Sequence, residues 1–284
     1  MFSKIIAFFY QFLMRQLLGT GASKFRVIKL AHDYMVKLLP NENFETNNFK
    51  MVSESGNLFL TQISNKFEIS FCEKKISKNM NVVDIGANVG YYTVNLANIV
   101  GEKGKVFAFE PDPKNFSILE KNIHLNNFKN VILINKAVSE SSSFTTLFQN
   151  SSNTGGHSII KNEDSEKQIV VETITLDEYF KNFYDPIDLV KIDVEGAEYQ
   201  IIAGGLNFFK KLKPKYLITE FELNSVNSSH VDFFYPTLLS NLGYVLLGKT
   251  YNSKGNSRLD SCSFSELKNH EKKKEVVNLI WELP

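Results

Sequence analysis

The sequence predicts an α/β domain built on a doubly wound, mostly parallel sheet with helices on both faces. Three observations carry the prediction. Short apolar runs alternate with longer helical stretches from residue 81 onward. A turn containing glycines follows the first apolar run, and an acidic residue follows the second. This alternation is typical of parallel sheets, because their strands are buried on both faces and are therefore continuously apolar.

The elements of the sheet are read from the length and composition of each run. Five runs are too short for helices and rich in β-branched or aromatic residues, which favours buried strands. They are Asn81–Ile85, Lys105–Phe109, Val131–Ile134, Asp188–Ile192 and Tyr216–Thr219. Helices are expected over Tyr91–Val100, Pro113–Asn126, Leu176–Phe183, Ala197–Leu212 and Val231–Leu242. Two later runs, Tyr244–Leu247 and Val276–Trp281, predict edge strands that could be antiparallel.

A lead-in region, residues 49–80, precedes the first strand of the sheet. Two strand-like runs, Phe49–Val52 and Leu58–Gln62, flank Ser55-Gly56-Asn57 and predict a hairpin. We therefore expect an N-terminal helical segment over residues 1–48 and one domain over residues 49–284.

An insertion, residues 139–175, interrupts the alternation between the third and fourth parallel strands. It is expected to hold strands at Thr145–Gln149 and Ile169–Ile174, with a loop at 150–160. Because this position follows the carboxyl end of a parallel strand, the loop is expected to overhang that rim of the sheet.

The composition excludes several function classes. The 284 residues are 43% apolar, and 32 Lys and Arg against 31 Asp and Glu leave a net charge of +1. No overall basic field is present to hold nucleic acid. Cys72 and Cys262 lie far apart and match no zinc-ligand or disulfide pattern, which favours a reducing compartment and a cytoplasmic location.

The N-terminal stretch Ile5–Leu18 is apolar but is interrupted by Gln11 and Arg15. It is too short to cross a bilayer. We expect a helix packed on its own domain or on a subunit partner, which leaves a homo-oligomer open. Two alternatives also stay open: residues 1–20 could contact a membrane surface, or the stretch could be a signal peptide.

The turn after the first strand indicates the class of cofactor. It reads Asp84-Ile85-Gly86-Ala87-Asn88-Val89-Gly90 and leads into a helix. Dinucleotide sites have the pattern G-x-G-x-x-G, whose second glycine gives the pyrophosphate room, and Asn88 stands at that position. S-adenosylmethionine has no pyrophosphate and carries a positive sulfonium and ammonium, which suit an acid such as Asp84. The turn therefore favours S-adenosylmethionine over a nicotinamide cofactor.

An acid at the end of the second strand supports adenosine binding. Glu110, followed by Pro111, stands about 20 residues after Gly90, where a carboxylate can accept both ribose hydroxyls. Nicotinamide and adenosyl cofactors share this feature, so Glu110 does not choose between them.

More ionisable residues lie at the rim of the fourth and fifth strands. Alternation places Lys191, Asp193 and Glu195 on one face of the fourth, and Glu220 ends the fifth. Charged side chains in an apolar strand are costly unless paired, so a Lys–Asp pair could also be purely structural. We hypothesise that Asp193 acts as a base or anchors the acceptor, with Glu195, Glu220, Glu222 and His230 as second choices. A magnesium ion shared by Asp193 and Glu220 is an alternative.

Five segments together resemble one known family. The runs VVDIGANVGYYT, FAFEPDP, NKAVSE, TLDEY and KIDVEGAE are similar to those of the FkbM family of S-adenosylmethionine-dependent methyltransferases, and the resemblance extends from Phe49 to the C-terminus. It implies a class I methyltransferase (Rossmann-like) fold with a seven-stranded sheet. It also implies O-methylation of a hydroxyl on a sugar, a polysaccharide or a polyketide-like acceptor.

The resemblance also implies a set of cofactor residues, from the methionine end to the adenine. They are Asp84, Gly86, Ala87, Asn88, Gly90, Tyr91, Glu110, Pro111 and Ala137. Lys136 stands just before Ala137, where many class I methyltransferases carry an acid, which argues against a carboxylate contact with the adenine amino group. Two other functions stay open: a non-catalytic protein that binds the cofactor or a partner, and a nicotinamide-dependent oxidoreductase.

Overall fold

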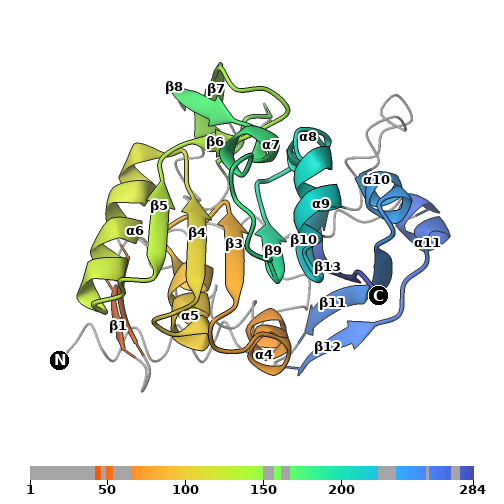
Figure 1. Ribbon diagram of the computed structural model, residues 1–284, viewed down its shortest axis with the longest axis horizontal. Coiled ribbons are helices and arrows are strands. Elements are labelled where there is room, and N and C mark those ends of the chain that lie inside the picture. The colour runs from red at the N-terminus through yellow and green to blue at the C-terminus, as the bar shows by residue number, and fades with distance from the viewer. Residues whose placement is uncertain are drawn as a thin grey trace, which may run out of the picture.

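A central eight-stranded sheet organises the described part of the chain in the computed structural model (Figure 1). The structure describes residues 42–45, 49–53, 66–149, 157–160, 167–222, 235–253, 256–269 and 276–284. The strand order is β12-β11-β13-β10-β9-β3-β4-β5.

Five of these strands form the parallel part of the sheet, as predicted. They are β3 (Asn81–Ile85), β4 (Lys105–Phe109), β5 (Val131–Ile134), β9 (Leu189–Ile192) and β10 (Tyr216–Glu222). The strand β13 (Val276–Glu282) pairs antiparallel with β10, and β11 (Val245–Ser253) pairs antiparallel with β13. Both strands expected from these runs are therefore present and antiparallel, but neither lies at the edge of the sheet, because β13 lies between β10 and β11 and the outer side of β11 is itself paired.

Helices cover both faces of the sheet, which confirms the doubly wound arrangement. One face carries α4 (Lys66–Lys75), α5 (Tyr91–Val100) and α6 (Pro113–Leu125). The other carries α7 (Leu176–Tyr179), α8 (Glu198–Ala203), α9 (Leu206–Leu212), α10 (Tyr235–Asn241) and α11 (Phe264–Asn269). None of the helices in these described segments is long and apolar enough to span a membrane.

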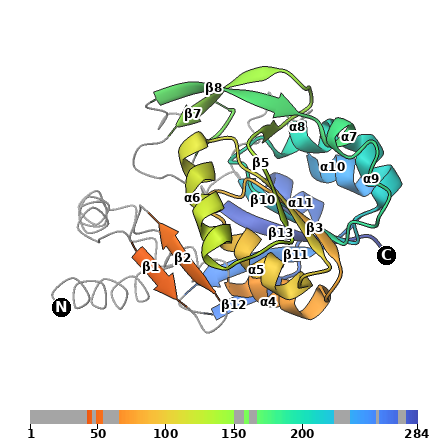
Figure 2. The ribbon, with the colours of Figure 1, turned by 60° about the vertical axis from the view of Figure 1, so that its left-hand side comes forward.

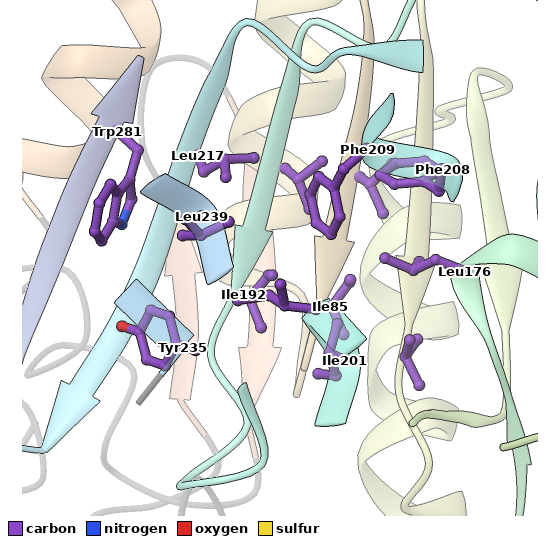
Figure 3. Packing of buried hydrophobic residues seen from close by; sticks show 14 of the residues in the cluster. Ile85, Leu176, Ile192, Ile201, Phe208, Phe209, Leu217, Tyr235, Leu239 and Trp281 are labelled. Atoms are coloured by element: carbon purple, nitrogen blue, oxygen red, sulfur yellow. The ribbon is translucent and has the colours of Figure 1, made fainter. Parts of the chain in front are cut away.

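Two apolar clusters stabilise the layers. The cluster beneath α7 to α11 joins Ile85, Ile192 and Trp281 from the strands to Phe209 and Leu239 from the helices (Figure 3). Successive strand residues point to opposite faces, so each buried strand supplies side chains to both clusters. Burial of the apolar surface in these two clusters is the main favourable contribution to folding.

One expected long helix is two short ones. The sequence predicted a helix over 197–212, but α8 ends at Gly204 and α9 begins after Gly205. A Cβ at Gly204 would lie 2.3 Å from the carbonyl oxygen of Ser139, so the chain there contacts the start of the insertion. Only glycine permits that approach.

The sheet has one strand more than the seven implied by the family resemblance. The additional strand, β12 (Asn256–Asp260), pairs antiparallel with β11 and forms the edge of the sheet. Its sequence, NSRLD, is mostly polar, so no apolar run marked it.

The lead-in hairpin differs from the expectation. The strand β2 (Lys50–Ser53) pairs antiparallel with β1 (Glu42–Glu45), which precedes it. A strand therefore lies within the segment expected to be helical. The predicted partner at 58–62 lies outside the described residues, as do residues 1–41 with their expected helix.

The insertion forms a separate three-stranded sheet. Its order is β6-β8-β7, from β6 (Ala137–Val138), β8 (Lys167–Ile174) and β7 (Phe144–Gln149). The two longer strands were predicted. Figure 1 shows this small sheet above the ends of β3, β4 and β5.

Candidate active site

The glycine turn between β3 and α5 has an unusual backbone. Gly86, Asn88 and Gly90 have φ values of 78°, 52° and 96°, all in the left-handed region. The amides of Gly86 and Ala87 both donate to the carbonyl of Phe109, at 3.0 and 2.9 Å. Left-handed backbone in a non-glycine residue is uncommon and persists where surrounding contacts enforce it. The turn is therefore a constrained element.

Close packing explains the two glycines that flank this turn. A Cβ on Gly86 would lie 1.9 Å from the carbonyl oxygen of Asp193, and one on Gly90 would lie 2.6 Å from Cδ1 of Leu119. The first contact brings the turn directly against the end of β9. The cofactor residues and the catalytic acids predicted from the sequence therefore adjoin one another.

A buried ion-pair network lies beneath the turn. Lys191 Nζ lies 3.5 Å from Asp84 Oδ1 and 3.2 Å from Asp193 Oδ2, and it donates to the carbonyl of Gly86 at 3.2 Å. Asp84 Oδ2 accepts from the hydroxyl of Thr93 at 2.6 Å. Burial alone would lower the pKa of Lys191, but the carboxylates of Asp193 and Asp84 outweigh it and the pKa is raised. Lys191 is a cation shared by the two acids.

Glu110 holds the turn from the second strand. Its Oε2 accepts from the amide of Asn88 at 2.7 Å, and its Oε1 accepts from the amide of Asp112 at 2.9 Å. Each carboxylate oxygen has a second lone pair, so both could still accept from a ligand hydroxyl. Burial raises the pKa of Glu110 to about 7, although these amides lower it.

Three carboxylates gather at the rim beside the turn. One oxygen from each of Asp193, Glu195 and Glu220 lies within 4.8 Å of the others. Burial and the charge of Asp193 raise the pKa of Glu220 well above its usual range. Glu195 has a φ of 56°, which marks a second strained position at the site. These three residues are among the catalytic candidates of the sequence analysis, and the fold places them together. His230 lies outside the described residues.

This cluster can act chemically in two ways. A carboxylate within reach of an acceptor hydroxyl can take its proton. Oxygen ligands at this spacing could also hold a divalent cation such as magnesium. Lys191, at 3.2 Å from Asp193, supplies a positive charge to the cluster from the protein itself.

The insertion reaches across the rim, as predicted. Ser158 Oγ donates to the carbonyl of Glu195 at 2.8 Å, beyond the end of β9. Next to it, His157 Nδ1 lies 3.3 Å from Asp112 Oδ2, beyond the end of β4. Since β3 lies between β9 and β4 in the sheet, these two contacts span the end of β3 where the glycine turn begins.

Asp112 has a structural role next to Glu110. It caps α6, accepting from the amides of Lys114 at 2.8 Å and Asn115 at 3.0 Å. Burial would raise its pKa, but hydrogen bonds from His157, Asn115 and Gln149 lower it to about 2. Its carboxylate is therefore occupied by protein groups.

The remaining predicted cofactor residues line the same edge. Ala87 and Tyr91 are buried in the turn and in the first turn of α5, and Pro111 is partly exposed after Glu110. Ala137 begins β6 and packs with Leu147 and Val171 of the insertion. Lys136 forms an ion pair with Glu172 of β8, so its side chain has a partner within the insertion sheet.

The sequence analysis missed two residues that support the site. Glu198 is buried at the start of α8, and its Oε1 accepts from the amides of Val194 at 3.4 Å and Gly196 at 3.3 Å. Asn122 on α6 donates to the carbonyl of Val89 at 2.7 Å. Two asparagines four residues apart, Asn122 and Asn126, were the available signal, because that spacing puts both on one face of a helix.

The site fits an adenosyl cofactor. Its acids suit a ligand with positive charges, and Glu110 has lone pairs for ribose hydroxyls. Asn88 Oδ1 is buried with no hydrogen-bond partner among the described residues, and such an acceptor suits a ligand ammonium or hydroxyl. Beyond the rim, a Cβ on Gly196 would meet nothing within 4 Å, so this part of the loop borders open space.

Comparison with known proteins gives a consistent set of matches. The family described as "Methyltransferase FkbM domain" matches residues 84–246, more than half of the chain. A protein named methyltransferase sdnD from Sordaria araneosa is 25% identical over 160 residues, which are 45% of this chain and 61% of that protein. The chain thus matches less than two thirds of that relative's length.

Solved structures of low identity also align. One is a methyltransferase FkbM from Methylobacillus flagellatus KT, which is 15% identical. The alignment covers 79% of this chain and 52% of that chain, with a TM-score of 0.45. Another is Aeropyrum pernix fibrillarin with bound S-adenosyl-L-methionine, which is 10% identical. The alignment covers 85% of this chain and 82% of that chain, with a TM-score of 0.46.

Proposed function

Because this chain belongs to the FkbM methyltransferase family, we propose that it transfers a methyl group from S-adenosylmethionine to an acceptor hydroxyl. The observation that carries the proposal is the contact between the glycine turn and the acidic rim. Gly86 lies against the carbonyl of Asp193, and Lys191 joins the two. A cofactor held by the turn would therefore present its methyl group beside the acids.

Residues of the chain would hold the cofactor along the rim. Asp84 and the turn from Gly86 to Gly90 would receive the methionine end, and Glu110 would accept from the ribose. Ala137 and its neighbours would border the adenine. The cofactor supplies an electrophilic methyl group on a sulfonium, so the protein's task is to align the acceptor in line with it.

We assign the proton transfer to Asp193. Methyl transfer would require the acceptor hydroxyl to lose its proton as its oxygen takes the methyl group, with the sulfonium leaving as a neutral thioether. The hydroxyl proton passes to the Asp193 carboxylate, which Lys191 holds at 3.2 Å. Glu195 and Glu220, close to Asp193, would orient the acceptor's other polar groups.

The charge of the rim supports an uncharged acceptor. Asp193, Glu195 and Glu220 line it, and Lys191 beside them is already paired with Asp84 and Asp193. An anionic group next to the Asp193 carboxylate would be repelled, whereas hydroxyl groups can donate to the carboxyl oxygens of this cluster. This is consistent with a sugar, polysaccharide or polyketide-like acceptor, the class that the family resemblance implies.

The test is methyl transfer to a panel of neutral saccharides and polyhydroxyl compounds, followed as a mass increase of one methyl group. We expect transfer to a neutral acceptor and loss of about 100-fold or more in turnover for Asp193→Asn. Cofactor affinity should be retained in that variant. A variant with full turnover would remove Asp193 as the base. An intact protein that binds cofactor but methylates nothing would support the non-catalytic alternative.

A further inference from the structure

Two asparagine side chains of α6 form hydrogen bonds with β2 of the β1–β2 hairpin, in the places where a neighbouring strand would bond. Asn122 Oδ1 accepts from the amide of Val52 at 2.7 Å, and its Nδ2 donates to the carbonyl of Val52 at 3.0 Å. Asn126 makes the same pair of bonds with Lys50, at 2.7 and 2.6 Å. Figure 2 shows the β1–β2 hairpin beside α6.

The geometry of helices and strands explains why this works. Residues four apart on a helix rise by about 6 Å, and residues two apart on a strand by about 6.6 Å. Asparagines at positions 122 and 126 therefore meet residues 50 and 52 in register. The edge of β2 that faces away from β1 is paired by these amides.

Only Asn122 also reaches the cofactor turn. Its second Nδ2 hydrogen is donated to the carbonyl of Val89 at 2.7 Å, so a single buried amide joins the hairpin to the turn. Val89 precedes Gly90, the N-cap of α5, and its carbonyl lies outside the helical ladder. Asn126 has no such contact; its Nδ2 bonds the carbonyls of Lys50 and Asn122.

The turn needs such support. It contains three left-handed residues, and side chains from three elements hold it: Lys191 at Gly86, Glu110 at Asn88, and Asn122 at Val89. The first two belong to the site already described. Leu119, one helical turn before Asn122, also packs against Gly90, so α6 contacts the end of the turn twice.

We infer that Asn122 is a positioning residue for the cofactor site: it holds Val89 so that the turn keeps its ligand-receiving shape. The inference rests on the proposed function, in that the turn is taken to bind S-adenosylmethionine. It also makes the hairpin a support of that turn.

The test compares Asn122→Ala with Asn126→Ala in the full chain. Both remove one pair of hairpin bonds, and only the first removes the Val89 contact. We expect Asn122→Ala to weaken S-adenosylmethionine binding about tenfold, the scale of one lost hydrogen bond, with kcat at saturating cofactor little changed. The affinity of Asn126→Ala for S-adenosylmethionine should stay within about twofold of the wild-type value.

A second readout needs no cofactor. Hydrogen exchange of peptides covering 86–93 should accelerate in Asn122→Ala only, whereas peptides covering 49–53 should accelerate in both variants. If Asn122→Ala does not fold, Asn122→Asp serves, because it keeps the size and the acceptor for the amide of Val52 but loses the Nδ2 donor to the carbonyls of Val52 and Val89. Equal effects of the position-122 and position-126 variants on affinity and on exchange at 86–93 would overturn the inference. If the two variants show this exchange pattern but the wild-type protein binds no S-adenosylmethionine, the proposed function is overturned and the role of Asn122 in holding the turn is not.

Discussion

Lys191 Nζ lies 3.5 Å from Asp84 Oδ1, and their side chains are only 4% and 0% exposed. The two residues face each other across the pairing of β3 with β9. The same ammonium lies 3.2 Å from Asp193, so one cation connects the residue expected at the cofactor's methionine end with the proposed base. The Lys191–Asp84 pair therefore belongs to the candidate site and also joins β3 to β9 inside the protein.

Removing this cation should strongly destabilise the protein. Lys191→Met leaves Asp84 buried without its ionic partner, and breaking a buried pair in this way costs about 3–5 kcal/mol of unfolding free energy. Urea denaturation measures the change. Lys105→Met is the control, because the Lys105–Asp185 pair is 3.8 Å apart and exposed. An exposed pair contributes about 0–1 kcal/mol. Equal losses in the two variants would show that the buried network contributes little.

Cofactor affinity should depend on pH through Glu110. Its pKa of about 7 means that the carboxyl becomes protonated as the pH falls below 7. Ribose hydroxyls donate to the ionised form, so affinity should weaken by about tenfold in total as the pH falls from 8 to 6 across this pKa. Titration calorimetry with S-adenosylmethionine between pH 6 and 8 measures this. Glu110→Gln should bind more weakly and show a flat profile; a variant that kept the wild-type pH slope would exclude Glu110 as its source.

The approach of Gly86 to β9 gives a steric prediction. Gly86→Ala places a methyl group 1.9 Å from the carbonyl of Asp193 and should abolish cofactor binding or folding. Gly196→Ala is the matched control, since Gly196 also has a positive φ, 103°, but its added Cβ meets nothing within 4 Å. Thermal melts should show a larger loss for Gly86→Ala. Similar losses would mean that backbone strain, and not the close approach, sets the requirement.

Removal of divalent ions should leave methyl transfer unchanged. Lys191 already supplies a positive charge at 3.2 Å from Asp193, so the proposed base needs no metal to hold it. Turnover is measured after dialysis against EDTA. A loss of activity that magnesium restores would contradict this and would make Asp193, Glu195 and Glu220 metal ligands.

The parallel core could be predicted from the sequence because its strands are apolar throughout. The strands β3, β4 and β5 begin and end where the apolar runs do. The edge was harder to predict, since β12 is mostly polar and gains its order by pairing with β11. The break between α8 and α9 depends on a tertiary contact of Gly204 with Ser139, which helical periodicity does not encode.

The site was predictable to the extent that strand ends define it. The neighbouring ends of the fourth and fifth strands bring Asp193, Glu195 and Glu220 together, but strand alternation does not account for Glu195, which follows the end of β9 with a φ of 56°. The contribution of Asn122 could not be predicted, because it depends on where a hairpin 70 residues earlier packs against α6. Likewise, the contact of Ser158 with Glu195 depends on how the insertion folds back over the rim.

The most direct test of the account is calorimetric titration of the folded, full-length chain with S-adenosylmethionine, S-adenosylhomocysteine and NAD. We predict saturable binding of both adenosyl ligands, weakened by Glu110→Gln, and no binding of NAD. Binding of NAD without either adenosyl ligand would contradict the central claim that the glycine turn and the acidic rim form a site for S-adenosylmethionine.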